Sequence, residues 1–284
     1  MIVEIGGAAV LNRVSFDVRA GEAVALIGSN GAGKSTLLAA CGGLIKAASG
    51  RIELMGRDVW HTAVRDPRWL RRRVGMALQF PERGFFASTV RGELLFTARR
   101  VGKKEASESA LRSLQRLGLP AEWLDRSPFA LSGGEKRRLA LAAAIAHEPE
   151  LLLFDEPEAG LDARGRRLVG ALLRDHAAGG GAALVATHDV EGATGWADRI
   201  LLLEEGRIRG EARAAQWERG EWPDWLLPFL ADGGRAAEVH RAAKAHGVSL
   251  PAPYGRPLRF LEALERLGER GERGGKSRGS AGRP

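Results

Sequence analysis

The chain has 284 residues, 44% of them hydrophobic and 27% charged, which suits one large folded domain with a modest appendage. Its formal net charge of +8 is spread thinly, with small clusters at Arg71–Arg73 and Lys136–Arg138, so we expect a solvated basic face rather than a nucleic-acid site. The lone cysteine, Cys41, excludes an intrachain disulfide, no apolar run reaches the ~20 residues of a membrane span, and the N-terminus does not resemble a signal peptide. These features predict a cytosolic protein that meets a membrane only through a partner or its surface.

The predicted elements alternate between short apolar runs and helical segments. In chain order they are an antiparallel strand at Val14–Val18, a buried strand at Ala23–Ile27, helices from about Lys34 and at Glu105–Leu117 and Glu135–His147, a buried strand at Leu151–Phe154, a helix at Ala163–His176, a buried strand at Ala183–Ala186 and a hairpin at Arg199–Ala212. Strands that alternate with helices form mostly parallel sheets. The predicted fold class is therefore α/β, with a mostly parallel sheet and an antiparallel edge.

The composition changes after Ala212, where the main domain of residues 1–212 is expected to end. Trp217, Trp222 and Trp225, together with several prolines, are interpreted as a linker into a small helical appendage within residues 213–267. The last stretch, residues 268–284, is rich in Gly and Arg, and this composition predicts disorder.

A glycine-rich segment follows the first buried strand and fits the pattern G-x-x-x-x-G-K-[ST]. It consists of Gly28, Ser29, Asn30, Gly31, Ala32, Gly33, Lys34 and Ser35, with Thr36 continuing into the helix. In such a loop the backbone N–H groups surround a phosphate at the positive end of the helix, the lysine reaches the β- and γ-phosphates, and the hydroxyl ligates Mg²⁺. A chance glycine-rich turn is a weak alternative, because the required strand and helix are both predicted.

Two further segments narrow the class of nucleoside-triphosphate hydrolase to which the chain could belong. The strand Leu151–Phe154 ends in Asp155 and Glu156; the first acid can hold Mg²⁺ through water and the second can polarise the attacking water. Upstream, Leu131–Glu135 leads straight into a helix that Ser132 can cap. Taken alone, that segment could equally be a simple helix cap.

Together these motifs resemble those of ABC ATPases. Leu131–Glu135, with Ser132, Gly133 and Gly134, is similar to the family's signature motif, although Glu135 stands where Gln is commonest. Gln79 resembles the Q-loop glutamine, Asp155 and Glu156 the Walker B pair, Asp162 the end of the D-loop, and His188 the switch histidine. The resemblance covers roughly residues 10–212 and implies a RecA-like core with a helical subdomain inserted at about residues 83–145.

The resemblance also implies an ATPase cycle with ATP and Mg²⁺. Glu156, His188 and Gln79 would be catalytic, and Ser35, Gln79 and Asp155 would hold the metal. Two such subunits, identical or different, would form a head-to-tail sandwich in which ATP at Lys34 of one is covered by Ser132–Gly134 of the other, with Asp162 coupling the two sites. One feature departs from the family: residues Ile5–Val10, where an aromatic side chain usually stacks on adenine, contain none.

The segment from Gln79 to Val90 resembles the ATPase subunits of energy-coupling-factor transporters, including the cobalt and nickel type. It contains Gln79-Phe80-Pro81-Glu82, two further aromatics and Thr89-Val90. This resemblance implies an importer of a vitamin or transition-metal ion, with the chain at the cytoplasmic face of the membrane. An integral membrane coupling protein would dock near Gln79–Phe86, and a separate membrane protein would capture the substrate.

Two alternatives stay open from the sequence. Phe85 and Phe86 could simply be core residues of the helical subdomain. The chain could also be a soluble ABC ATPase acting on nucleic acid or ribosomes. Only the basic charge favours that second function, because such proteins usually carry two cassettes or a long coiled-coil insertion, so no nucleic-acid partner is expected.

Overall fold

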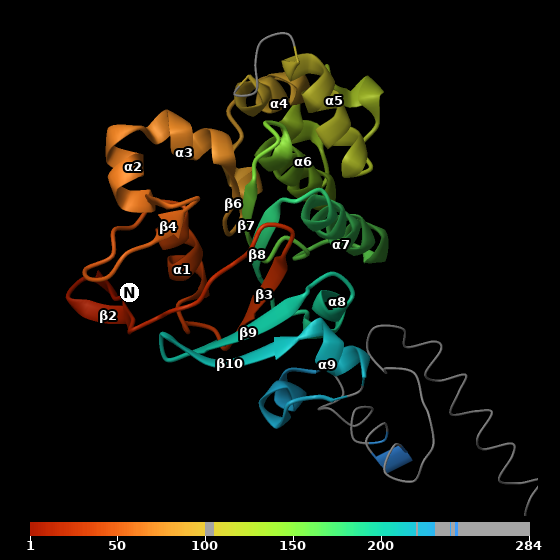
Figure 1. Ribbon diagram of the computed structural model, residues 1–284. Coiled ribbons are helices and arrows are strands. Elements are labelled where there is room, and N and C mark those ends of the chain that lie inside the picture. The colour runs from red at the N-terminus through yellow and green to blue at the C-terminus, as the bar shows by residue number, and fades with distance from the viewer. Residues whose placement is uncertain (100–104, 220, 231–238, 240–241, 244–284) are drawn as a thin grey trace, which may run out of the picture. The chain divides into compact units, whose positions relative to one another are not determined.

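The computed structural model describes residues 1–99, 105–219, 221–230, 239 and 242–243 (Figure 1). The chain divides into two compact units, which are treated separately: the first comprises Met1–Asp189 and Trp196–Glu211, and the second comprises Val190–Gly195 and Ala212–Pro284. The predicted boundary at residue 212 and the limits of the inserted subdomain stay predictions. The expected disordered tail at 268–284 and most of the expected appendage at 213–267 lie outside the described residues.

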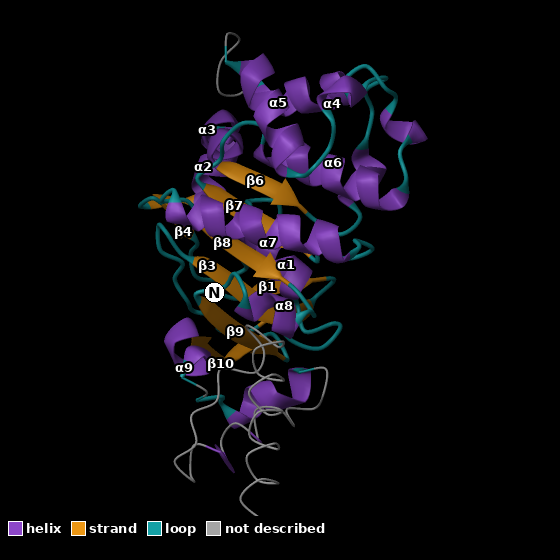
Figure 2. Ribbon diagram, turned by 90° about the vertical axis from the view of Figure 1, so that its right-hand side faces the viewer, coloured by secondary structure: helices purple, strands orange, loops and turns teal. Residues whose placement is uncertain are grey.

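The centre of the first unit is a six-stranded sheet in the order β10-β9-β3-β8-β7-β6 (Figure 2). Adjacent strands from β9 through β3, β8 and β7 to β6 pair in parallel, whereas β9 and β10 are joined by only two residues and therefore run antiparallel. The strands are β3 (Ala23–Ile27), β6 (Val74–Ala77), β7 (Leu151–Asp155), β8 (Ala182–Ala186), β9 (Arg199–Glu204) and β10 (Arg207–Arg213). The predicted mostly parallel α/β sheet with an antiparallel edge is confirmed.

Two small antiparallel hairpins accompany this sheet. They are β1 (Val3–Ile5) with β2 (Ala8–Leu11), and β4 (Glu53–Leu54) with β5 (Arg57–Asp58). The helices of the first unit are α1 (Lys34–Cys41), α2 (Val59–Arg65), α3 (Pro67–Arg73), α4 (Val90–Ala98), α5 (Ala106–Arg116), α6 (Gly133–Ile145) and α7 (Ala163–Ala178), with short 3₁₀ turns at Pro81–Gly84, Ala121–Trp123 and Pro128–Ala130.

Helices cover both faces of the large sheet. Side chains alternate between the faces of a strand: Leu152 and Phe154 of β7 join a core with residues of α4 to α7, whereas Leu153 between them joins a second core with Leu37 and Leu38 of α1. Cys41 ends α1 and packs against this second core, and burial raises the pKa of its thiol to about 12.

The prediction of an antiparallel strand at Val14–Val18 is wrong, because the segment belongs to no strand or sheet. Its backbone groups bond elsewhere. The N–H of Val14 donates to the Met1 carbonyl and the Val14 carbonyl accepts from the Met1 ammonium, while the Asp17 carbonyl accepts from the guanidinium of Arg199. The alternating apolar residues therefore reflect burial of one side, not strand pairing.

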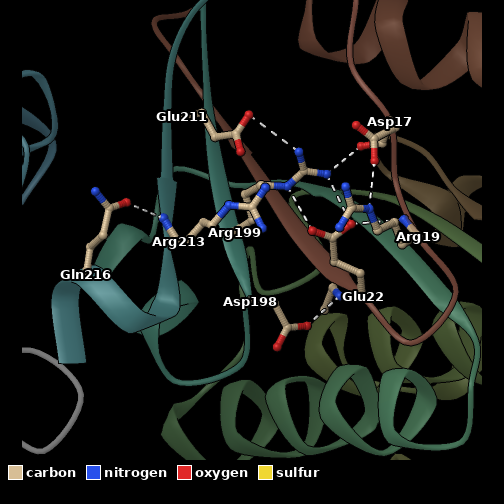
Figure 3. A network of polar contacts seen from close by, with 9 residues as sticks. Asp17, Arg19, Glu22, Asp198, Arg199, Glu211, Arg213 and Gln216 are labelled. Atoms are coloured by element: carbon tan, nitrogen blue, oxygen red, sulfur yellow. Dashed lines mark hydrogen bonds and ion pairs between the residues drawn. The ribbon is translucent and has the colours of Figure 1, made fainter. Parts of the chain in front are cut away.

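The guanidinium that bonds to Asp17 belongs to Arg199, which lies at the centre of a network of polar contacts (Figure 3). Its side chain is 4% exposed and lies 2.8 Å from a Glu22 carboxylate oxygen and 3.5 Å from one of Glu211. The neighbouring Asp198 accepts from the N–H of Ala23 at 2.8 Å. These contacts tie β9 to the beginning of β3, the strand that leads into the glycine-rich loop.

The second unit contains α8 (Val190–Thr194), α9 (Ala214–Glu218) and a 3₁₀ helix at Asp224–Phe229. Trp217 and Trp222 are 2% and 4% exposed. They are therefore core residues of a folded segment, and the interpretation of the tryptophans as marks of a linker is wrong for these two. None of the helices in the described ranges is both long and apolar enough to cross a bilayer.

Candidate active site

The glycine-rich loop joins β3 to α1 in a conformation that only glycine adopts easily. Gly28, Gly31 and Gly33 have φ angles of 149°, 81° and 102°, all in the region that disfavours side chains. A Cβ at Gly28 would lie 2.1 Å from the Leu203 carbonyl oxygen, and one at Gly33 would lie 2.8 Å from Leu11. At Gly31 nothing lies within 4 Å, so the loop is packed on its inner side and open at its tip.

Lys34 lies inside this loop rather than in solvent. It is 8% exposed, and its Nζ donates to the Gly28 carbonyl at 2.7 Å and to the Ser29 carbonyl at 3.1 Å. Helix α1 has no side-chain cap at its first turn, unlike α4, α6 and α7, which are capped by Thr89, Ser132 and Asp162. An uncapped N-terminus beside a buried ammonium is a site for an anion such as phosphate.

The two acids leave the end of β7 in different environments. Asp155 is 4% exposed, and burial raises the pKa of its carboxyl group, opposed by a hydrogen bond from the Ser35 hydroxyl. The backbone of Glu156 has a left-handed conformation, with a φ of 49°, and its N–H donates to the Ala186 carbonyl at 2.8 Å. This turn directs the Glu156 side chain away from the strand, where 27% of it is exposed.

His188 and Gln79 meet the acids at the same edge of the sheet. His188 Nδ1 lies 3.5 Å from Glu156 Oε1, so the structure brings these two predicted catalytic residues together. Gln79 is exposed and follows β6, and β6 is parallel to β7 with Ala77 opposite Phe154. Gln79 therefore leaves the sheet beside Asp155 and Glu156.

The residues present fit a hydrated Mg²⁺ ion. Oδ2 of Asp155 is buried without a hydrogen-bond partner, and the Ser35 hydroxyl lies beside this carboxylate. Within the described ranges, no cluster of three or more His, Cys, Asp or Glu side chains could hold a metal by itself. Mg²⁺ commonly uses one or two protein ligands together with water and nucleotide phosphates, and this donor set matches that arrangement.

The segment around Ser132 differs from the phosphate loop. Ser132 and Glu135 form a reciprocal capping box, with Ser132 N–H donating to Glu135 Oε2 at 2.8 Å and Glu135 N–H to Ser132 Oγ at 3.4 Å. Hydrogen bonds with Ser132 lower the pKa of the Glu135 carboxyl group. Asp162 caps α7 by accepting from Gly165 N–H at 2.6 Å. Both motifs therefore make helix caps, which for Ser132 was the plain alternative, and both Ser132 and Asp162 are exposed.

The sequence profile of the ABC transporter family matches residues 11–159. The chain belongs to this family. As an ABC ATPase it is 36% identical over 255 residues to the energy-coupling factor transporter ATP-binding protein EcfA2 of Lactobacillus delbrueckii subsp. bulgaricus, covering 89% of this chain and 87% of that protein. It is 42% identical over 212 residues to the cobalt import ATP-binding protein CbiO of Rhodobacter capsulatus, covering 74% and 75%.

Solved structures agree with this family assignment. The structure of cbiO1 from Clostridium perfringens, described as part of the ABC transporter complex cbiONQ, matches this ABC ATPase with a TM-score of 0.66 and 26% identity, over 84% of this chain and 98% of that one. The dimeric cassette MJ0796 bound to ADP and Pi has a TM-score of 0.67 at 24% identity, over 75% of this chain and 95% of that one, and supports the fold.

The hairpin β1–β2 lies against the phosphate loop of the ABC ATPase, since the packing around Gly33 includes Val10 and Leu11. The segment Ile5–Val10, which lacks the aromatic residue usual in the family, therefore leads into the part of the hairpin that packs on the phosphate loop. Ile5 is a large apolar residue there, and it is 49% exposed.

Sequence analysis assigned no role to two buried charged residues that support the site. Arg137 is 5% exposed and touches both Glu82 and the backbone of Glu156. Glu93 is also 5% exposed and accepts from the N–H groups of Phe86 and Ala87, each at 2.6 Å. In the sequence, the only indication of such residues is a charged side chain at a helical position whose neighbours on the same face are apolar.

Proposed function

We propose that this ABC ATPase is the ATP-hydrolysing subunit of an energy-coupling-factor importer for a vitamin or transition-metal ion, acting at the cytoplasmic face of the membrane. The observation that carries the proposal is the convergence of Lys34, Asp155, Glu156 and His188 at one edge of the sheet, in a chain that matches EcfA2 over 89% of its length. A soluble ABC ATPase acting on nucleic acid or ribosomes is not favoured by these relatives.

We assign the chemistry as follows. The loop from Gly28 to Thr36 binds the phosphates through its N–H groups, and Lys34 exchanges its two loop carbonyls for β- and γ-phosphate oxygens. Mg²⁺, when bound, neutralises charge that develops on the phosphates. Ser35 and Asp155 are its proposed ligands, with Gln79 completing the set.

Glu156 is the proposed general base. It is partly exposed beside the phosphate edge and can accept a hydrogen bond from the attacking water. His188, 3.5 Å from it, orients Glu156 and contacts the γ-phosphate. Ser132, Gly133 and Asp162 are exposed. We assign Ser132–Gly134 and Asp162 to the nucleotide site of a second ABC ATPase subunit, either identical or different.

The proposed docking surface for the membrane coupling protein is a set of three exposed rings. Phe80, Phe86 and Phe96 are 44%, 62% and 58% exposed, and Phe86 and Phe96 form an edge-to-face pair with centroids 4.8 Å apart. Phe85 instead packs against the core, so the two aromatics of this segment divide between the core and the surface. Exposed aromatics of this kind suit apolar helices of a membrane protein, which would in turn contact the substrate-capture protein.

The test of catalysis is Glu156→Gln, which keeps the shape of the side chain and removes the base. We expect turnover to fall by about 10²–10⁴-fold with ATP binding retained, so that an ATP-bound dimer accumulates in size-exclusion chromatography. Glu4→Gln, at an exposed position of strand β1, is the matched control. Turnover near that of the wild type in Glu156→Gln would contradict the assignment.

The test of docking is Phe86→Asp, measured by co-purification from detergent-solubilised membranes. We expect the integral membrane partner to be lost while ATP binding of the isolated chain is kept. Phe129→Asp, an equally exposed ring at 59%, is the control. Strong, salt-sensitive RNA or DNA binding by the wild type would instead favour the alternative function.

A further inference from the structure

One buried guanidinium joins the loop after Gln79 to the turn after β7. Arg137 lies on α6, and only 5% of its side chain is exposed. Its Nη1 is 3.0 Å from Glu82 Oε2, and its Nη2 donates to the Glu156 carbonyl at 2.7 Å. Glu82 belongs to the 3₁₀ turn that follows Phe80, so a single side chain on α6 holds both segments.

Both segments have strained backbones where Arg137 holds them. Phe80, two residues before Glu82, has a φ of 54°, and Glu156 has a φ of 49°. Such left-handed residues with side chains persist only where their surroundings fix them, and they gather at functional sites and switch regions. Arg137 bonds directly to the carbonyl of Glu156 and reaches the turn after Phe80 through Glu82.

The loop is held at its far end by a different residue. Glu93 accepts the N–H groups of Phe86 and Ala87, but these bonds tie the loop to α4 and not to Glu156. Among the described residues, Arg137 therefore links the turn that follows Phe80 to the catalytic turn.

We propose that Arg137 is a positioning residue that makes the placement of Glu156 depend on the placement of the loop 80–84. This inference rests on the proposed function, in which Glu156 is the base and the neighbouring rings dock the membrane protein. Arg137 acts through Glu156, because it holds the backbone carbonyl of the residue proposed as the base. When the membrane partner moves the loop 80–84, the guanidinium of Arg137 transmits this movement to the turn at Glu156.

The planar fork of arginine explains why this residue type is needed. Two of its nitrogens reach two acceptors at the same time, whereas the single ammonium of lysine satisfies one of them well. Arg137→Lys therefore keeps the buried charge and removes the bridge. Glu82→Gln removes the charge at one end while leaving the bond to the Glu156 carbonyl.

The experiment uses the full chain and compares Arg137→Lys, Glu82→Gln, the double variant and Lys136→Met. Lys136 precedes Arg137 on α6, and the structure shows no hydrogen bond or ion pair of its side chain with any described residue. We measure kcat and KM for ATP, the Kd of a fluorescent ATP analogue, the stoichiometry of its binding, and hydrogen exchange of the amides at 80–87.

For Arg137→Lys we expect kcat to fall about ten- to a hundredfold, with KM and the Kd of the analogue within about twofold of the wild type. Exchange at 80–87 should become faster, and the double variant should lose little more than the worse single variant, because the two residues act through one contact. Lys136→Met should match the wild type in all four measurements.

Two results would overturn the proposal. One is a kcat of Arg137→Lys equal to that of Lys136→Met; the other is a loss of activity explained by fewer binding-competent molecules, which would make Arg137 merely structural. Glu156→Gln is measured alongside: if that variant turned over normally, the proposed function itself would fail. If it is inactive while Arg137→Lys is normal, only the present inference fails.

Discussion

The phosphate loop and the segment at Ser132 are both helix N-termini, yet they differ in how their polar groups are satisfied. The phosphate loop leaves α1 without a side-chain cap and places the buried Lys34 against its own carbonyls. At α6, the side chains of Ser132 and Glu135 each accept from the other's backbone N–H, and Ser132 remains exposed. The first arrangement leaves N–H groups and an ammonium that can bind an anion within one chain. The second already has N–H groups paired by side chains at its start, and its exposed side can contact another molecule.

The largest expected effect is on the ATP affinity of the isolated chain, which should depend on the phosphate loop and not on Ser132. Lys34→Ala should weaken ATP binding to the isolated chain by about a hundredfold or more, since a charged contact to phosphate is removed. Ser132→Ala should leave that affinity within about twofold and lower turnover instead. Isothermal titration calorimetry and steady-state hydrolysis give the two values.

Loss of the cap at Ser132 also costs about 1 kcal/mol of stability, so a matched cap variant is needed. Thr89→Ala removes the equivalent cap of α4 and should lose similar stability with normal turnover. If Ser132→Ala weakened binding to the isolated chain as strongly as Lys34→Ala, the contrast between the regions would be wrong.

An intermediate effect concerns Asp155, the buried acid beside the phosphate loop. Burial raises the pKa of its carboxyl group above the ordinary 3.8, so the folded state holds this proton more tightly than the unfolded chain. Its contribution to stability is present below pH 3.8 and is lost as the pH rises through the raised value.

Asp155→Asn removes this unfavourable buried charge. We expect the ligand-free variant to melt about 2 °C or more above the wild type at pH 7, but to gain little stability from Mg²⁺ and ATP. Asp58→Asn, at the exposed cap of α2, is the control and should not raise the melting temperature. A lower melting temperature for Asp155→Asn would show that the carboxylate is stabilising in the ligand-free fold.

The smallest expected effect concerns the base of the nucleotide. Because Ile5–Val10 contain no aromatic ring, the site lacks a stacking contact of about 0.5–1.5 kcal/mol. ATP and GTP should therefore compete for the phosphate loop with affinities within about threefold of each other. A preference for ATP above about tenfold would mean that another residue grips adenine.

Local patterns predicted the sheet and the phosphate loop well. The buried strands β3, β7 and β8 are short apolar runs, and their identity depends on composition rather than on distant contacts. Val14–Val18 looks equally strand-like, but its carbonyl at Asp17 bonds to Arg199, 182 residues away in sequence. Whether an extended segment joins a sheet depends on which backbone groups remain available, and no local pattern contains that information.

The sequence by itself determined the phosphate loop, the acid pair and the order of the motifs, because each is a short run whose chemistry depends on adjacent residues. Only the tertiary structure decided that His188 meets Glu156, that Phe85 packs against the core while Phe86 is exposed, and that Arg137 joins two turns with left-handed residues. These facts require segments far apart in the chain to meet. Packing, rather than local propensity, brings them together.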